Sequence, residues 1–310
     1  MQRRKFTKEI STVLAGVSLV GAISEAEECQ NIRNRVPKTD THVHLFDLDY
    51  LTYSWLDRAP EINRSFDLKD FRDATRKANV TKILFMESGA DAGQGVKEAS
   101  KVQALAAKEK RIKGIIARLD LQKGKKATPE LEQLIQLDLL RGVRCGFPKE
   151  AHLSNDFADG LALLREHNLT FDLLLSPDRM EGATKLAAKF PDNTFILDHI
   201  GNPDIKNNRI AEWKAGIKQL SAIPNINCKI SGVITRVGKG WSLSDIKPYV
   251  AFVIKQFGMN RLVYGGDWPV VLRGGSYLSW ARAFETLTDD LSPDAQQKIY
   301  HENANRIYNL

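Results

Sequence analysis

The feature that most constrains the fold is a regular alternation of short apolar segments with longer amphipathic ones. Eight of the short segments are rich in β-branched and other apolar residues, which is typical of buried parallel strands. Eight strands that alternate with helices predict a single (β/α)₈ TIM barrel, an α/β fold. The predicted strands are 38–46, 81–87, 112–120, 140–145, 170–175, 194–200, 225–231 and 261–267.

The stretches between these segments show helical periodicity. Segments 95–110, 156–168 and 242–258 place apolar residues on one face, so we predict a helix in each. Segment 47–80 is long for a first crossover and rich in Tyr, Trp, Asp and Arg, so we expect an ordered loop near the active site. An open doubly wound sheet is the structural alternative. No G-x-G-x-x-G follows any predicted strand, which argues against its dinucleotide-binding form.

The first residues form a targeting signal rather than part of the barrel. Residues 1–24 hold a charged start, an uncharged run and a small-residue end, which is typical of a signal peptide. Within it, Arg3–Lys8 ("RRKFTK") resembles the twin-arginine export motif, although an ordinary secretory signal could also begin this way. We therefore expect a periplasmic or secreted protein without a stable membrane anchor, with a linker at 25–36 and the barrel at 37–310.

The net charge of +7 could indicate an anionic partner, but the sequence has no run of five or six basic residues. Nucleic-acid binding is therefore not predicted. The three cysteines, an odd number at no regular spacing, do not indicate a disulfide framework. A small-molecule substrate is the expected partner, and the sequence leaves the oligomeric state open.

Four residues that can bind ligands or protons lie at predicted strand ends. His42 and His44 are two positions apart near the end of the first strand, so both imidazoles should point into the barrel. His199 ends the sixth strand, and Asp267 ends the eighth. In a (β/α)₈ barrel the active site lies at the carboxyl ends of the strands, so we expect these residues to meet there. Two buried imidazoles side by side are difficult to satisfy without a shared ligand, which favours a functional role.

Motifs along most of the predicted barrel resemble those of one enzyme superfamily. The first-strand D-x-H-x-H (40–44), "DHIGNP" (198–203), "GGDWP" (265–269) and the closing "ENANRIYNL" (302–310) resemble the amidohydrolase superfamily. The segments "YSWL", "RGVR" and "CKISG" are similar to its lactonase branch, which includes sugar-acid lactonases and the pyrone-dicarboxylate lactonase. The resemblance implies a barrel hydrolase that opens a lactone to the hydroxy acid.

The chemistry of the residues agrees with this implication. Ester hydrolysis needs a base for the attacking water, and donors or positive charge for the developing oxyanion. Asp267 is the candidate base, which would take a proton from water and return it to the leaving alkoxide. His42, His44 and His199 are the other catalytic candidates, because they would polarise the lactone carbonyl directly or through a metal.

The sequence leaves the role of a metal open. The lactonase branch includes metal-free enzymes as well as enzymes with one divalent ion. The fifth predicted strand has no histidine, and the fourth carries Arg144, which would repel a cation. If one ion is bound, zinc is the expected metal. Its candidate ligands are His42, His44 and Asp267, with His199 and Glu87 as further candidates.

Basic and aromatic side chains near the same end of the barrel are candidates for substrate binding. Basic groups would bind a carboxylate or a polyol acid, and aromatic faces would pack on a sugar ring. The alternative is that the basic groups pair with Glu87, Asp120 or Asp172 inside the barrel. The substrate-binding candidates are Arg118, Arg144, Lys229, Tyr53 and Trp268.

Two other functions are compatible with part of this pattern. A metal-dependent decarboxylase of the same superfamily also carries a first-strand H-x-H and a final aspartate, but it usually has a fifth-strand histidine, which this chain lacks. An exported sugar-acid binding protein without catalysis is the second alternative. The presence of all the candidate catalytic residues together argues against it.

Overall fold

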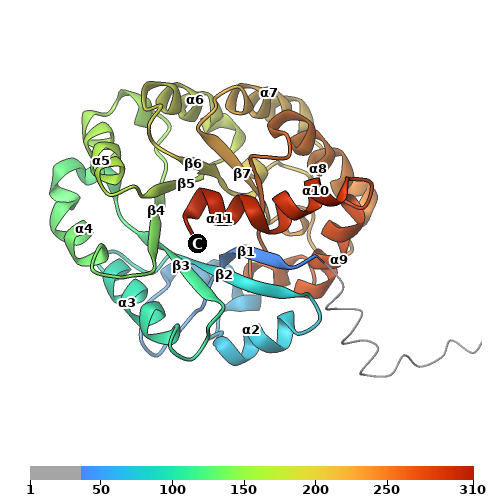
Figure 1. The fold of residues 1–310 in the computed structure, drawn as a ribbon, viewed down its shortest axis with the longest axis horizontal. Coiled ribbons are helices and arrows are strands. Elements are labelled where there is room, and N and C mark those ends of the chain that lie inside the picture. The colour runs from blue at the N-terminus through green and yellow to red at the C-terminus, as the bar shows by residue number, and fades with distance from the viewer. Residues whose placement is uncertain (1–35) are drawn as a thin grey trace, which may run out of the picture.

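The computed structural model describes residues 36–310. Their eight strands form one parallel sheet in the order β1 to β8, and the helices surround it as an outer ring (Figure 1). The predicted (β/α)₈ barrel is therefore confirmed, and the open doubly wound sheet is wrong. The strands are β1 (Lys38–Val43), β2 (Val80–Met86), β3 (Ile112–Arg118), β4 (Leu140–Gly146), β5 (Thr170–Leu174), β6 (Phe195–Leu197), β7 (Ile226–Ile230) and β8 (Leu262–Tyr264).

The predicted signal peptide (1–24), and all but the last residue of the predicted linker (25–36), lie outside the described residues. Both therefore stay predictions. Among residues 36–310, no helix has the length and apolar composition needed to cross a membrane.

The three predicted helices are confirmed, and each ends a few residues from its predicted boundary. The helix at Asn155–Glu166 shows why the pattern works, because its apolar positions Phe157, Leu161 and Leu164 are all buried against the barrel. The helices are α2 (Leu68–Thr75), α3 (Gly95–Leu105), α4 (Thr128–Leu134), α5 (Asn155–Glu166), α6 (Met180–Lys189), α7 (Ile210–Ser221), α8 (Leu243–Phe257), α9 (Tyr277–Leu287), α10 (Pro293–Gln297) and α11 (Asn303–Tyr308).

Segment 47–80 is ordered, as predicted, but it is more than a loop. It contains two short 3₁₀ turns, Ser54–Arg58 and Pro60–Ile62, and then α2. A capping box begins α2, because the Asp67 carboxylate accepts the N–H of Asp70 while the Asp70 carboxylate accepts the N–H of Asp67. The capping box marks the start of α2, a helix that was not predicted because the segment is rich in polar residues.

The helix α11 covers the amino-terminal end of the barrel (Figure 1). Its Tyr308 and Ile307 pack with Leu84 of β2 and Val263 of β8 in a small apolar cluster. The Tyr308 hydroxyl reaches up to donate a hydrogen bond to Asp172 of β5 at 3.1 Å. The barrel interior is therefore apolar at the amino end and charged at the carboxyl end, where the predicted site lies.

The barrel closes between β1 and the residues that follow β8. The Asp267 N–H donates to the His42 carbonyl at 2.8 Å, and the His44 N–H donates to the Trp268 carbonyl at 2.7 Å. The buried Asp40 carboxylate reinforces this seam, because it accepts the N–H of Gly266 at 2.7 Å and that of His42 at 3.0 Å. Closure therefore places the His42–His44 segment directly beside Asp267.

We predict that Asp40→Ala weakens this seam. The change would leave the buried N–H of Gly266 and the hydroxyl of Tyr277, which donates to Asp40 at 2.7 Å, without an acceptor. Each unsatisfied buried donor costs about 1–3 kcal/mol, so we expect the free energy of unfolding to fall by about 3 kcal/mol. Urea denaturation followed by circular dichroism would measure it. Asp73→Ala, in an exposed pair with Lys69, is the control and should change stability by less than about 0.5 kcal/mol.

Candidate active site

The four predicted catalytic residues meet at the carboxyl end of the barrel. His42 lies on β1, His44 directly follows it, His199 follows β6 and Asp267 follows β8. All four are buried. The Nε2 atoms of His42, His44 and His199 lie 3.8, 3.8 and 4.0 Å from one carboxylate oxygen of Asp267. Three imidazoles therefore surround a single carboxylate oxygen, as the strand-end positions predicted.

Strained backbone aims two of these side chains. His199, Ile200 and Asn202 have φ values of 52°, 48° and 48°, and Asp267 has a φ of 58°. Left-handed φ values cost non-glycine residues roughly 1–2 kcal/mol each, and the cost is greatest for a β-branched residue such as Ile200. The Trp213 indole N–H holds this turn by donating to the Ile200 carbonyl at 2.7 Å. Such strain is typical of functional sites, where the surrounding structure compensates for it.

Hydrogen bonds to the other ring nitrogen orient the imidazoles. Nδ1 of His44 lies 3.0 Å from the Met86 carbonyl, which can only accept, so the neutral ring carries its proton there and presents a lone pair at Nε2. Nδ1 of His199 lies 2.9 Å from the Ser231 hydroxyl. The backbone and Ser231 therefore fix the direction in which each Nε2 faces Asp267.

A buried chain of charges supports the site from below. Arg144 donates to Glu87 at 2.7 Å and to Asp198 at 3.1 Å. Lys229 lies 2.9 Å from Asp198 and donates to Asp172 at 2.7 Å. Positive and negative groups alternate, so each buried charge has an opposite neighbour, as the low dielectric of a barrel interior requires.

The same charged side chains also position His42. Its Nδ1 lies 3.4 Å from the Asp198 carboxylate and 3.3 Å from the Lys229 ammonium. Burial would raise the pKa of Asp198, but Lys229, His42 and Arg144 outweigh it and hold that pKa well below its ordinary value. Asp198 is therefore ionised and can accept the Nδ1 proton of His42. Nε2 of His42 then faces Asp267 at 3.8 Å and the Arg144 guanidinium at 3.4 Å.

Burial keeps two imidazoles of the site, those of His42 and His199, uncharged. Burial lowers the pKa of His42 well below its ordinary value, although the neighbouring Asp198 opposes that effect. Burial likewise lowers the pKa of His199 to about 4. Both rings are therefore neutral near pH 7, the form in which imidazole binds metals.

A cavity of about 380 Å³ opens above this cluster. Its walls include His44, His199 and Asp267, together with Trp55 from the long segment after β1. A smaller cavity of about 130 Å³ adjoins it and is also lined by His199 and Asp267. Arg236, which follows β7, lines this smaller cavity, and burial lowers the pKa of its guanidinium.

The five predicted substrate-binding residues lie in different places. Arg118 and Arg144 line the catalytic cavity. The Arg118 guanidinium is partly exposed and lies 3.7 Å from Glu87, whereas Arg144 is buried and paired. Lys229, Tyr53 and Trp268 are not among the residues that line this cavity.

Two of the basic residues form ion pairs inside the barrel, which the sequence analysis gave as the alternative to substrate binding. Arg144 pairs with Glu87, and Lys229 pairs with Asp172, inside the barrel. Tyr53 lines a different cavity, between α2 and α3. Substrate contact by Lys229, Tyr53 or Trp268 stays a prediction.

The residues present fit a divalent metal ion. Donor atoms of His42, His44 and Asp267 lie within 4.8 Å of one another. The neutral form of His44 presents its Nε2 lone pair toward the Asp267 carboxylate, so a cation between these two acceptors would bind both. Two imidazoles and a carboxylate are ligands that zinc prefers. His42, Asp198 and His199 form a second group, but Lys229 and Arg144 already occupy Asp198.

Sequence reasoning missed three residues of the site. Asp198 stands next to His199 in "DHIGNP" and could have been found as a carboxylate at a strand end. Ser231 ends the "CKIS" strand two positions after Lys229, so strand periodicity places both on one face. Arg236 lies in a turn without periodicity, and no sequence pattern marks it.

Fold and site together define a (β/α)₈ barrel enzyme with a histidine–aspartate centre at the carboxyl ends of its strands. The chain belongs to the amidohydrolase family, whose model matches residues 39–310. It is 27% identical over 288 residues to an L-fucono-1,5-lactonase of Burkholderia ambifaria, covering 88% of this chain and 96% of that protein.

Solved structures share the fold. An amidohydrolase from Burkholderia multivorans with bound zinc superposes with a TM-score of 0.77 at 24% identity, covering 88% of this chain and 99% of that one. A putative 2-pyrone-4,6-dicarboxylic acid hydrolase from Pseudomonas putida has a TM-score of 0.66 at 20% identity, covering 89% and 98%. Decarboxylases also share the barrel at lower identity, so the fold alone does not separate these reactions.

We predict that Lys229→Met destabilises the protein strongly. The change would leave the buried Asp172 and Asp198 carboxylates without their shared cation. Removing one partner from a buried ion pair typically costs about 3–5 kcal/mol. Urea denaturation would measure the change. Lys185→Met breaks an exposed pair with Glu181 and is the matched control, with an expected cost below about 1 kcal/mol. Equal stability of the two variants would show that the charge chain does not hold the barrel interior.

Proposed function

We propose that this protein hydrolyses a sugar-acid or related lactone to the hydroxy acid. The observation that carries the proposal is the Asp267 carboxylate oxygen, which faces three imidazole Nε2 atoms at the wall of a cavity of about 380 Å³. The family membership and the lactonase name of the Burkholderia ambifaria relative support the same reaction.

The residues can carry both proton transfers. Asp267 takes a proton from a water molecule, whose oxygen attacks the lactone carbonyl carbon. When the ring C–O bond breaks, Asp267 returns the proton to the departing alkoxide, so the product is a hydroxy acid and the carboxylate is regenerated.

A divalent ion held by His42, His44 and Asp267 would supply Lewis-acid polarisation of the carbonyl and would lower the pKa of a bound water. The ligand geometry supports this part of the proposal, as does the zinc in the Burkholderia multivorans structure. His199, held by Ser231 with its Nε2 4.0 Å from Asp267, would orient the substrate carbonyl.

Basic groups around the two cavities suit an anionic or hydroxyl-rich substrate. Arg118 offers a partly exposed guanidinium at the wall of the catalytic cavity. Arg236 and Arg273 line the adjoining one, where Glu61 engages Arg273. Guanidinium groups bind carboxylates and vicinal hydroxyls through paired N–H donors, so a lactone with acidic or polyol substituents fits this end of the site.

A decarboxylase is the second candidate function. The residues argue against it, because β5 carries Asp172 rather than a histidine, and Lys229 occupies that carboxylate below the cavity. If the protein opens a lactone of the panel below and releases no CO₂ from any of these substrates, it is a lactonase and not a decarboxylase. A binding protein without catalysis would give a calorimetric signal with a lactone and no product.

We predict that Asp267→Asn folds normally and lowers kcat at least about 100-fold, the loss expected for a missing general base. A pH-indicator assay over a panel of sugar-acid lactones would measure turnover, and circular dichroism would verify the fold. Asp73→Asn, on the exposed face of α2, is the control and should keep the wild-type rate. An Asp267→Asn variant with near wild-type turnover would rule out the mechanism.

We also predict that the purified protein holds one equivalent of a divalent metal. Elemental analysis would measure it, and dialysis against a chelator should abolish turnover until zinc is restored. Because Nε2 of His44 should be a ligand, His44→Phe should lose the metal and turnover together. Full turnover by metal-free protein would instead make the histidines direct partners of the substrate.

A further inference from the structure

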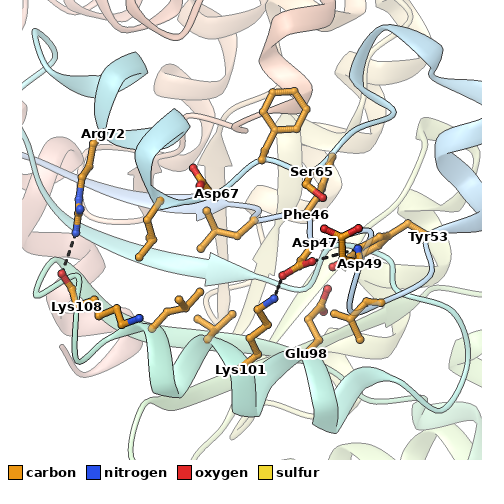
Figure 2. A pocket seen from close by; sticks show the side chains of 16 residues that line it. Phe46, Asp47, Asp49, Tyr53, Ser65, Asp67, Arg72, Glu98, Lys101 and Lys108 are labelled. Carbon is orange, nitrogen blue, oxygen red and sulfur yellow. Dashed lines mark hydrogen bonds and ion pairs between the residues drawn. The ribbon is translucent and has the colours of Figure 1, made fainter.

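A second cavity, of about 450 Å³, lies outside the active site. The segment after β1, α2 and α3 enclose it on the outer side of the barrel (Figure 2). None of the residues that line it also lines the catalytic cavity. Its volume lies within the range of small-molecule sites, and the proposed reaction has no use for it.

The body of this cavity is apolar and partly aromatic. Phe46 and Phe66 line it with their ring centroids 6.0 Å apart, and Tyr53 lies 5.6 Å from Phe46. Leu68 and Val102 line the cavity from α2 and α3. Such a surface releases water favourably when it receives an apolar group, and aromatic faces also attract cations.

A buried carboxyl stands at one end. Glu98 rises from α3 toward Asp47 (Figure 2), and its side chain is almost fully buried. Its hydrogen bonds come from the Ser88 N–H, at 3.3 and 3.2 Å, and no lysine, arginine or histidine of residues 36–310 pairs with it. Burial, and then the nearby Glu87, raises the pKa of Glu98 to about 8. A buried acid at a cavity wall without a cationic partner is incompletely satisfied.

The Tyr53 hydroxyl stands at the same end. Tyr53 is buried, and its hydroxyl faces the Glu98 carboxyl without forming a well-aligned hydrogen bond to any group of the described residues. Burial, and then the neighbouring Glu98, raises the pKa of Tyr53 above its ordinary value, so the hydroxyl stays protonated beside that carboxyl. A hydroxyl oxygen and a carboxyl thus present two acceptors to one ligand atom.

Three basic residues line the cavity, and none of them pairs with Glu98. Lys108 lies beside Arg72 at the end away from Glu98 (Figure 2). Lys101, one turn along α3 from Glu98, pairs with Asp47 (Figure 2). Arg72 of α2 donates to Glu109 at 2.8 Å. The Glu98 carboxyl therefore has no cationic partner of its own. Its pKa of about 8 leaves it mostly protonated near pH 7, and an ammonium ion that binds beside it would favour its ionised form.

We infer that this cavity binds a small organic ammonium ion. Its ammonium group donates to the Glu98 carboxylate and the Tyr53 hydroxyl, and its apolar body lies against Phe46, Phe66 and Leu68. The charge-assisted hydrogen bond between the ammonium group and Glu98, at the buried end of the cavity, provides the selectivity for a cation. The apolar walls provide the remaining affinity. This site does not depend on the lactonase reaction.

The test compares three probes of the same shape and different charge with the purified full-length protein. Isothermal titration calorimetry would measure binding of 2-phenylethylamine, 2-phenylethanol and phenylacetate. We expect 2-phenylethylamine to bind with 1:1 stoichiometry, at least about tenfold more tightly than the alcohol, and phenylacetate not to bind. Absence of binding by 2-phenylethylamine at 10 mM, roughly the weak limit for such a small ligand, would overturn the inference.

Variants locate the site. Glu98→Gln removes the charge with little change of shape and should weaken 2-phenylethylamine binding at least about tenfold. Glu132→Gln, on the exposed side of α4, is the matched control and should bind as the wild type does. Val102→Phe fills the cavity and keeps Glu98, so it tests the same site should Glu98→Gln not fold. Unchanged binding by both folded cavity variants would place the probe elsewhere and refute the site.

Discussion

The site depends on compensation of charge inside the barrel. Arg144 and Lys229 each bridge two buried carboxylates, and Asp198 lies between them as the shared partner. Charges in a low-dielectric interior are tolerated only as such alternating sets, because an unpaired ion costs several kcal/mol. Arg118 adds a third cation 3.7 Å from Glu87, so the set contains three carboxylates and three cations. Burial also raises the pKa of Asp172 to about 7. Glu87 and Asp198 therefore compensate the charge of Arg144, whereas Arg144 alone, as the sequence presents it, suggests repulsion of a metal ion.

The second constraint is the backbone after β6 and β8. The strand pattern of segment 194–200 continues to residue 200, yet β6 ends at Leu197 because the chain then enters a left-handed turn. That turn swings the His199 side chain toward Asp267, and the Trp213 hydrogen bond to Ile200 holds it there. Strain of this kind is retained where it positions a group that a regular strand could not. The left-handed turn that positions His199 therefore lowers local stability. Packing of α7, whose Trp213 is bonded to this turn, compensates for that loss.

These two constraints explain how far the sequence predicts the molecule. Strand-forming runs and helical periodicity are local, so the eight strands and the barrel were predictable. The positions of His42, His44, His199 and Asp267 followed, because parallel strands bring their carboxyl ends together. The sequence named Glu87 and Asp172 as possible partners of the inward bases, but it could not decide whether Arg144 and Lys229 pair with them or face the cavity, because strand periodicity allows both. The direction of Tyr53 was likewise hidden, since it lies in irregular backbone where no periodicity fixes which cavity a side chain lines.

The wall between the two cavities is thin and charged. Glu98 faces the cavity between α2 and α3 and accepts the N–H of Ser88, and Ser88 itself lines the catalytic cavity. The preceding Glu87 holds Arg144, which in turn holds the Asp198 that orients His42. Because Glu87 raises the pKa of Glu98, ionisation of Glu98 must in turn disfavour the charged form of Glu87, since coupling between two groups is reciprocal. A cation that fixes Glu98 as a carboxylate would cancel most of that repulsion by its own charge, so an ammonium ion can occupy the outer cavity without disturbing the Glu87–Arg144 pair on which the site depends.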